Sequence, residues 1–178
     1  MWSSPRLGPV GISKVDRLWV RGGFESRKDQ RTRPQRDRDR LLYSDAFRRL
    51  QGVTQVVSAD EGVVVHNRLT HSLKVGQVSR RLAEYLRSEE QTASDVLAAV
   101  GGLDPDVAET AGLAHDLGHP PFGHVAEYKL QELTGQDHFE GNAQSFRIVT
   151  KLEPHSHDYR GLDLTRGTLN GVLKYPRS

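Results

Sequence analysis

The sequence contains no cysteine, and this absence excludes disulfide bridges and metal sites built on thiolates. Any bound metal ion must therefore be held by histidine, aspartate or glutamate side chains. No apolar run approaches the length of a membrane-spanning helix, and charged residues interrupt residues 1–20, where a secretion signal would be apolar. We therefore expect a cytoplasmic protein with no membrane partner.

Common catalytic signatures are also missing. The sequence has no Gly-rich phosphate-binding loop, no serine or cysteine nucleophile motif and no internal repeat. Hydrophobic residues make up only 35% of the chain, which is low for a compact domain, but 178 residues still suffice for one domain with a buried core. The chemistry of the chain must come from other side chains.

Positive charge is concentrated in the N-terminal part of the chain. Residues 1–49 hold 13 Lys and Arg against 6 Asp and Glu, a local charge of +7, whereas the rest carries −5. This asymmetry favours an anionic partner such as phosphate or single-stranded nucleic acid, although a solvated leader explains residues 1–30 better. Because residues 1–35 are rich in Gly, Pro, Ser and Arg, we interpret them as an irregular basic leader.

Apolar periodicity and capping residues predict a mainly α-helical fold. The expected helices cover residues 36–51, 70–87, 104–115, 124–133 and 139–153, with a helix of uncertain length within 88–103 and a short one within 161–175. A small β-hairpin is expected near residues 54–65. Along 70–87, one stripe is predicted to face the core; it begins at His71 and continues through Val75, Val78, Leu82 and either Tyr85 or Leu86.

The segment from His115 to His124 is the most informative stretch of the sequence. It holds three histidines and Asp116 within ten residues, interrupted by two glycines and two prolines. A single histidine beside an apolar helix is usually a packed core residue, but this density of histidines next to a carboxylate favours a metal or catalytic site. Imidazole nitrogens and carboxylate oxygens suit a divalent cation such as Mn, Fe, Mg or Zn.

Helical spacing connects this segment with His71. Val107, Ala111 and His115 recur every four residues, so His115 lies on a core-facing stripe near the end of its helix. Two helices that each present a histidine inward can share one cation, although His71 by itself would more often be a core histidine. Arg68 lies three residues before His71 and can reach the same pocket mouth.

A second pair lies beyond the Pro-Pro turn. His124 and Glu127 are one helical turn apart, so the carboxylate can orient the imidazole and raise its basicity. The alternative is that Glu127 is an ordinary exposed glutamate. His155 and His157 fall in a predicted loop and are interpreted as surface residues.

Several strings resemble a known family. His71 followed by His115-Asp116 resembles the HD-domain metal-dependent phosphohydrolases, and longer strings resemble their deoxyguanosinetriphosphate triphosphohydrolase (dGTPase-like) branch. These strings are RDRDRLLYSDAFRRLQGVTQV, NRLTHSLKV, AGLAHDLGHPPFGHVAE, HFEGNAQSFRI and GLDLTRGTLNGVLKYP. The resemblance implies an HD-domain helical bundle, with residues 36–178 as its N-terminal portion. It also implies hydrolysis of a dNTP to deoxynucleoside and inorganic triphosphate, by water attack at the α-phosphorus.

The resemblance also implies roles for individual residues. His71, His115 and Asp116 would bind a divalent metal ion, with Mg or Mn expected first and Zn, Co, Ni or Fe as alternatives. The remaining assignments are His119, His124 and Glu127 as catalytic residues, Arg68 at the phosphates and Gln55 near the sugar 3′-hydroxyl.

One feature departs from the family pattern. The family's fourth metal ligand is an aspartate on a later helix, and no aspartate after residue 116 has the matching context. We therefore expect a truncated chain or fragment that binds metal weakly and turns over little dNTP, within a protein that forms homo-oligomers at full length. Two alternatives remain open: another HD-domain nucleotidase or phosphodiesterase, and a basic nucleic-acid-binding module with a vestigial site.

Overall fold

The computed structural model describes residues 29–53, 67–88, 102–135 and 139–174. Within these ranges the regular elements are helices, so the mainly α-helical prediction is confirmed. They are α1 (Arg33–Leu42), α2 (Asp45–Arg49), η1 (Leu50–Gly52), α3 (Arg68–Ser88), α5 (Pro105–Ala114), α6 (His124–Thr134), α7 (Gly141–Arg147), the π-helical turn η2 (Ile148–Leu152) and α8 (Arg166–Val172). The predicted hairpin near residues 54–65 lies outside the described residues, as does most of the predicted helix within 88–103. None of the described helices has the length and apolar character needed to cross a bilayer.

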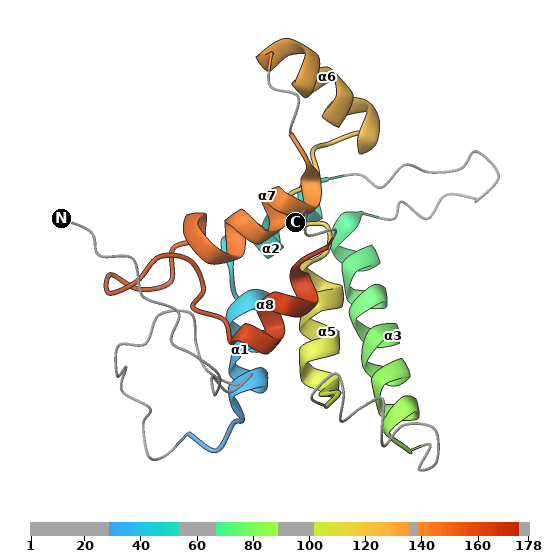
Figure 1. Cartoon of the computed structure of the whole chain (residues 1–178), viewed down its shortest axis with the longest axis vertical. Helices are drawn as coiled ribbons and strands as arrows, with labels where there is room; N and C mark the ends of the chain where they lie inside the picture. The colour runs from blue at the N-terminus through green and yellow to red at the C-terminus, as the bar shows by residue number, and fades with distance from the viewer. Residues whose placement is uncertain (1–28, 54–66, 89–101, 136–138, 175–178) are drawn as a thin grey trace, which may run out of the picture.

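Helix α5 is the central element of the fold. It packs along α3 and also contacts α1 and α8, whereas α6 projects away from the other helices (Figure 1). The core forms around Leu113 and Ala114 of α5, together with the buried residues Leu41, Phe47, Leu50, Leu117, Ile148, Val149, Leu162, Leu164, Leu169 and Val172. Leu117 directly follows Asp116, so its burial anchors the segment that carries the predicted metal ligands.

Small residues allow α3 and α5 to approach each other closely. A Cβ atom on Gly112 would lie 3.0 Å from the Cα of Gly76 and 2.7 Å from the Oγ of Ser79. A Cβ on Gly76 would lie 2.8 Å from the Cγ of Leu113. Because both glycines lie at the contact, the two backbones meet without intervening side chains, and this brings the first turn of α3 near the end of α5.

The predicted core stripe of α3 is wrong over most of its length. The buried positions of this helix are Arg68, Ser72, Gly76 and Ala83, whereas Val78 is 66% and Leu82 55% exposed. Tyr85 and Leu86 are exposed as well. Hydrophobicity selected the wrong face because close contact with α5 requires small side chains rather than large apolar ones.

Two of the predicted helices are interrupted. The helix expected over residues 36–51 begins at Arg33 and is broken at Tyr43, because the hydroxyl of Ser44 accepts the N–H of Phe47 and starts α2. The helix expected over residues 139–153 begins as α7 and ends as the π-helical turn η2.

A buried carboxylate joins α1 to α8. The Oδ2 atom of Asp37 accepts the N–H and the hydroxyl of Thr165 at 2.8 and 2.7 Å, and the hydroxyl of Thr168 at 2.8 Å. Asp37 is completely buried, and these hydrogen bonds satisfy its charge at the start of α8.

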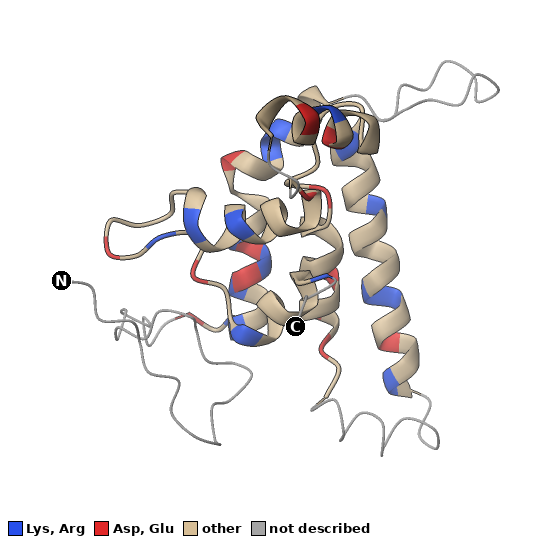
Figure 2. Ribbon diagram, turned by 45° about the horizontal axis from the view of Figure 1, so that its top comes forward, with Lys and Arg blue, Asp and Glu red and all other residues tan. Residues whose placement is uncertain are grey.

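The charges of the helical body are largely paired. Acidic and basic residues lie close together on the helices (Figure 2). Arg38 on α1 contacts Glu109 on α5 at 2.8 Å, and Arg80 on α3 donates to both Asp106 and Glu109. Arg40 on α1 donates to the backbone carbonyls of Leu162 and Asp163. These arginines therefore act in packing between helices.

Candidate metal centre

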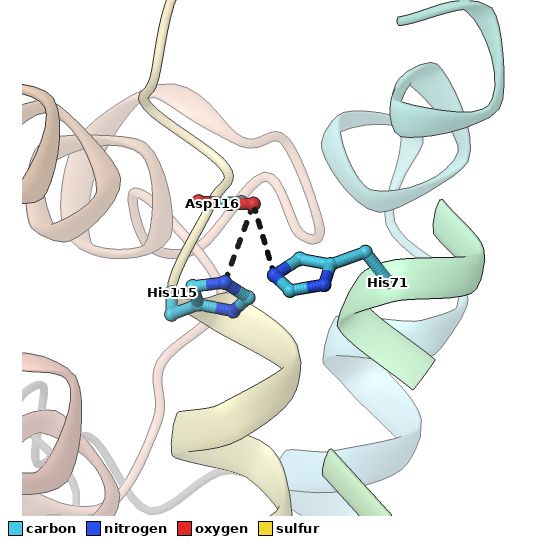
Figure 3. Close-up of side chains that lie close together, drawn as sticks. All are labelled: His71, His115 and Asp116. Atoms are coloured by element: carbon cyan, nitrogen blue, oxygen red, sulfur yellow. Dashed lines mark ion pairs between the residues drawn. The ribbon is translucent and has the colours of Figure 1, made fainter. Parts of the chain in front are cut away.

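Two packed helices bring the three predicted metal ligands together. His71 lies in the first turn of α3, His115 caps the C-terminus of α5, and Asp116 follows it directly. Figure 3 shows both imidazoles turned toward the Asp116 carboxylate, whose Oδ2 lies 3.2 Å from Nε2 of His115 and 3.9 Å from Nε2 of His71. One ligand atom from each of the three residues lies within 4.8 Å of the others. This spacing allows all three atoms to reach one ion.

A backbone contact fixes which nitrogen of His115 is available. Its Nδ1 lies 2.7 Å from the carbonyl oxygen of Gly112. Because a carbonyl can only accept, Nδ1 carries the proton and donates it, which leaves a lone pair on Nε2 in the neutral ring. Metal-binding histidines usually make such a hydrogen bond with the nitrogen that does not bind the metal.

The donor atoms fit a divalent cation. With His115 neutral, its Nε2 lone pair faces a carboxylate oxygen 3.2 Å away, and both atoms are electron-rich. A cation between them would convert this repulsion into attraction on both sides. Two imidazoles and one carboxylate are side chains that bind divalent cations.

The pKa shifts favour the ligand forms of two of these side chains. Burial and the neighbouring His115 lower the pKa of His71 below its ordinary value of 6.5, so its ring is neutral at neutral pH. Burial raises the pKa of Asp116, but His115 and His119, in the protonated forms present where this carboxyl titrates, together with the Arg68 guanidinium, lower it by more, and the net shift is downward. Asp116 is therefore ionised at neutral pH.

His119 lies between this cluster and Glu127, which pairs with His124 on α6. Its Nδ1 is 3.6 Å from Oδ1 of Asp116, and its Nε2 is 3.8 Å from Oε1 of Glu127. Nδ1 is buried and has no hydrogen-bond partner within the described part of the chain. Burial is the largest cause that lowers the pKa of His119, so this ring is also neutral at neutral pH.

The predicted contact between His124 and Glu127 is present. Nδ1 of His124 lies 2.6 Å from Oε2 of Glu127, whose other oxygen accepts the N–H of Gly141 at 3.1 Å. Glu127 is buried, which answers the alternative that it is an ordinary exposed glutamate, whereas the His124 side chain is 78% exposed. The carboxylate thus ties an exposed imidazole to the start of α7.

The start of α7 supports the segment after α5 through residues that the sequence analysis did not single out. Ser145 accepts the N–H of Gly118 at 2.9 Å, and its hydroxyl lies 3.0 Å from the carbonyl of Gly141 and 3.3 Å from that of His115. A Cβ atom on Gly118 would overlap the backbone of Ser145 and Gly141, and one on Gly141 would overlap Glu127. The only available signal was the spacing of small residues in the string HFEGNAQSFRI.

The remaining predicted residues fall in three environments. Arg68 is buried at the start of α3, and its guanidinium donates to the carbonyls of His119 and Pro120. Gln55 lies outside the described residues. His155 and His157 lie exposed in the loop before α8 and are not members of the three-residue cluster, as their interpretation as surface residues predicts.

Comparison with known families agrees with this geometry. Residues 68–168 match the model of the HD domain, a range that includes every residue of the three-ligand cluster. The chain therefore belongs to the HD-domain family, and the resemblance proposed from its strings is confirmed.

Curated relatives narrow the similarity within the family. A deoxyguanosinetriphosphate triphosphohydrolase-like protein of Caulobacter sp. (strain K31) is 44% identical over 178 residues, which cover 98% of this chain and 41% of the relative. Proteins of the same name from Caulobacter vibrioides and Jannaschia sp. are 47% and 46% identical, covering 85% and 87% of this chain and 35% and 36% of the relatives. The chain thus spans roughly two fifths or less of the length of these relatives. The names of these relatives agree with the branch that the strings resemble.

Proposed function

We propose that this chain supplies the metal-holding part of a dNTP triphosphohydrolase, which releases inorganic triphosphate from a dGTP-like substrate. The observation that carries the proposal is the arrangement at His115, where Nδ1 donates to Gly112 and Nε2 faces Asp116 and His71. This arrangement supports a cation site, and the names of the relatives support a nucleotide substrate.

The first role that we propose is metal binding by His71, His115 and Asp116, with Mg²⁺ or Mn²⁺ as the cation. A divalent cation held there would neutralise charge on the α-phosphate and lower the pKa of a bound water. Because these three side chains form the candidate ligand group among the described residues, the other coordination positions would be left to water or substrate. We infer that the chain by itself binds metal only weakly, with micromolar or weaker affinity.

The second role is proton transfer by His124 with support from Glu127. In the reaction, water attacks the α-phosphorus, the bond to the sugar 5′-oxygen breaks, and that oxygen takes up a proton. The Nδ1 of His124 is engaged by the Glu127 carboxylate, so the Nε2 of the exposed ring is the nitrogen that would give or take the proton. The carboxylate holds the orientation of the ring.

Three further residues complete the proposed site. His119 would lie beside the triphosphate, between the metal ligands and Glu127. Arg68 would contribute positive charge near the phosphates. It could also donate hydrogen bonds to them, because a guanidinium has five N–H donors and the two loop carbonyls leave others available. We also retain Gln55 as the contact to the 3′-hydroxyl, residues 1–35 as the basic leader and residues 36–178 as the N-terminal portion of the domain. A cytoplasmic location and a homo-oligomeric full-length protein complete the proposal.

Metal titration and product analysis test the proposal together. Calorimetry with Mn²⁺ should detect binding to the wild-type chain, and His115→Ala should weaken it more than a hundredfold, because a direct ligand is lost. His157→Ala, an exposed histidine outside the cluster, serves as the matched control and should bind as wild type does. Sub-micromolar affinity for the wild-type chain would contradict the inferred weak site.

The products identify the reaction. Incubation with dGTP and Mn²⁺ should release inorganic triphosphate and deoxyguanosine. Orthophosphate released from a nucleoside monophosphate would instead indicate another HD-domain nucleotidase. Salt-sensitive binding to single-stranded DNA that survives His115→Ala, without hydrolysis, would indicate the nucleic-acid-binding module.

A further inference from the structure

The side chain of Arg68 connects α3 to the loop that follows α5. Nη1 donates to the carbonyl of His119 at 2.6 Å, and Nη2 donates to the carbonyl of Pro120 at 2.7 Å. The residue is only 6% exposed. Its two amino groups therefore hold consecutive carbonyls of one loop in the fork geometry that a planar guanidinium provides.

The position of Arg68 on α3 gives this contact its importance. His71 lies one turn further along the same helix, and the carbonyls belong to the loop that begins with Asp116. Arg68 is therefore a direct polar connection between the helix that carries one candidate ligand and the segment that carries the others.

No carboxylate within the described part of the chain pairs with Arg68, so the loop carbonyls are its hydrogen-bond acceptors there. A buried guanidinium needs such acceptors, because burying a charge without them is costly. The guanidinium therefore depends on this loop conformation for its hydrogen-bond acceptors, and its hydrogen bonds in turn stabilise the loop.

We propose that Arg68 is a positioning residue, whose guanidinium clamps the His119 and Pro120 carbonyls and thereby holds Asp116 at the right distance from His71 for both to bind one cation. The inference rests on the proposed metal site and is independent of the identity of the substrate. It adds to the phosphate contact proposed for Arg68 a role that operates before any nucleotide binds.

The charge of Arg68 and its hydrogen bonds to the loop predict opposite changes in metal affinity when the residue is replaced. The positive charge of Arg68 repels a nearby cation. Its effect is visible at His119, whose pKa is lowered mainly by burial and to a smaller extent by the charge of Arg68. If charge alone mattered, removal of the guanidinium would strengthen metal binding. If the clamp matters more, removal would weaken it.

The test compares Arg68→Gln and Arg68→Lys in the full 178-residue chain, with Mn²⁺ alone as the probe. Arg68→Gln should lower Mn²⁺ affinity by about tenfold, the scale of lost support for metal ligands. It should also accelerate amide hydrogen exchange in residues 117–123. Arg68→Lys keeps the charge and some donors but not the planar fork, so it should recover part of both properties. The control is Arg81→Gln on the same helix, because Arg81 is exposed and pairs with Glu84, and this variant should behave as wild type.

Wild-type or tighter Mn²⁺ affinity in a folded Arg68→Gln variant would overturn the proposal. Should circular dichroism show that Arg68→Gln does not fold, Arg68→Lys decides: wild-type affinity together with wild-type exchange in residues 117–123 would then overturn it. Because neither readout requires turnover, the clamp can be tested even in a chain that turns over little dNTP. Release of a product other than inorganic triphosphate would reject the proposed reaction and leave the clamp standing.

Discussion

The two parts of the candidate site lie on either side of the same Gly- and Pro-rich loop but are held very differently. His115 belongs to the central helix, its side chain is 17% exposed, and its Nδ1 is bonded to the backbone of its own helix. His124 begins the projecting helix α6, is 78% exposed and has the Glu127 carboxylate as its partner (Figure 1). The proposed metal-ligand part is thus held at the end of the central helix. The proposed proton-transfer part lies on a projecting helix, which bonds to the segment around the start of α7 through Glu127 and Gln131. This difference suits the two proposed roles, since metal ligands must keep fixed distances and a proton carrier must reach its substrate.

The largest effect is expected from a substitution at Gly118, in the loop between the two parts of the site. Gly118→Ala places a Cβ atom where the backbone of α7 lies, so the loop and α7 must separate. We expect unfolding free energy to fall by about 3 kcal/mol or more, as for severe overpacking. Urea denaturation measures it. Gly52→Ala is the matched control, because a Cβ there meets no atom within 4 Å. An unchanged urea midpoint for Gly118→Ala would show that α7 does not pack on this loop.

His124→Ala should separate the two parts by function. Loss of the proposed proton carrier is expected to lower dGTP turnover by about a hundredfold, or about 2.7 kcal/mol in the barrier. Mn²⁺ affinity should stay at the wild-type value, whereas stability should fall by about 1 kcal/mol, because the buried Glu127 carboxylate loses its His124 partner. Turnover assays, calorimetry and urea denaturation measure the three quantities. Turnover within threefold of wild type would remove His124 from the mechanism.

Glu127→Gln should loosen α6 and leave the metal ligands in place. The amide has one acceptor oxygen where the carboxylate serves both Gly141 and His124, so we expect a loss of about 1–2 kcal/mol. Amide exchange along α6 should accelerate, with Mn²⁺ affinity within about threefold of wild type. Glu132→Gln, an exposed position on the same helix, should change neither. Loss of metal binding with unchanged exchange would contradict the separation of the two parts.

The smallest expected effect is on the pH dependence of the metal-free chain. The pKa values of His71 and His119 lie below the ordinary 6.5, so the unfolded chain binds these protons more tightly than the folded chain does. Stability should therefore be full above pH 6.5 and decline as the pH falls below it toward the folded pKa values. Urea midpoints measured with a chelator present should show this decline. In His119→Gln the decline should be smaller, and in His157→Gln it should equal that of wild type.

Sequence patterns predicted the parts of this molecule that depend on spacing along one helix. The contact of His124 with Glu127 followed from one turn of α6. The meeting of His71 with His115 was predicted from two helical stripes, and it is present although the stripe on α3 is wrong beyond its first turn. The buried face of α3 did not follow, because the helix packs through Ser72, Gly76 and Ala83 instead of its larger apolar residues. Hydrophobic periodicity identifies large side chains and does not recognise a close backbone contact.

Contacts between distant segments could not be read from the sequence. Ser145 supports Gly118 across the interval between α5 and α7, and Arg68 reaches two backbone carbonyls after α5. Every residue has a backbone carbonyl, so the sequence does not reveal which carbonyl an arginine will bind. An arginine that binds the backbone therefore cannot be distinguished by sequence from one that binds phosphate. The arginine was predicted from its place beside His71, but its loop contacts appeared only in three dimensions.

The glycine pair between α3 and α5 sets how closely the two helices approach each other. Gly76 and Gly112 bring the two helices together backbone to backbone, and His71 and His115 extend from the same pair of helices toward one point. The separation of the two helix backbones that carry these imidazoles is therefore set by a close main-chain contact. A methyl group added at either glycine would push the helices apart and carry the backbones of His71 and His115 with them. A substitution at the helix contact would therefore reach the candidate ligands without replacing either of them.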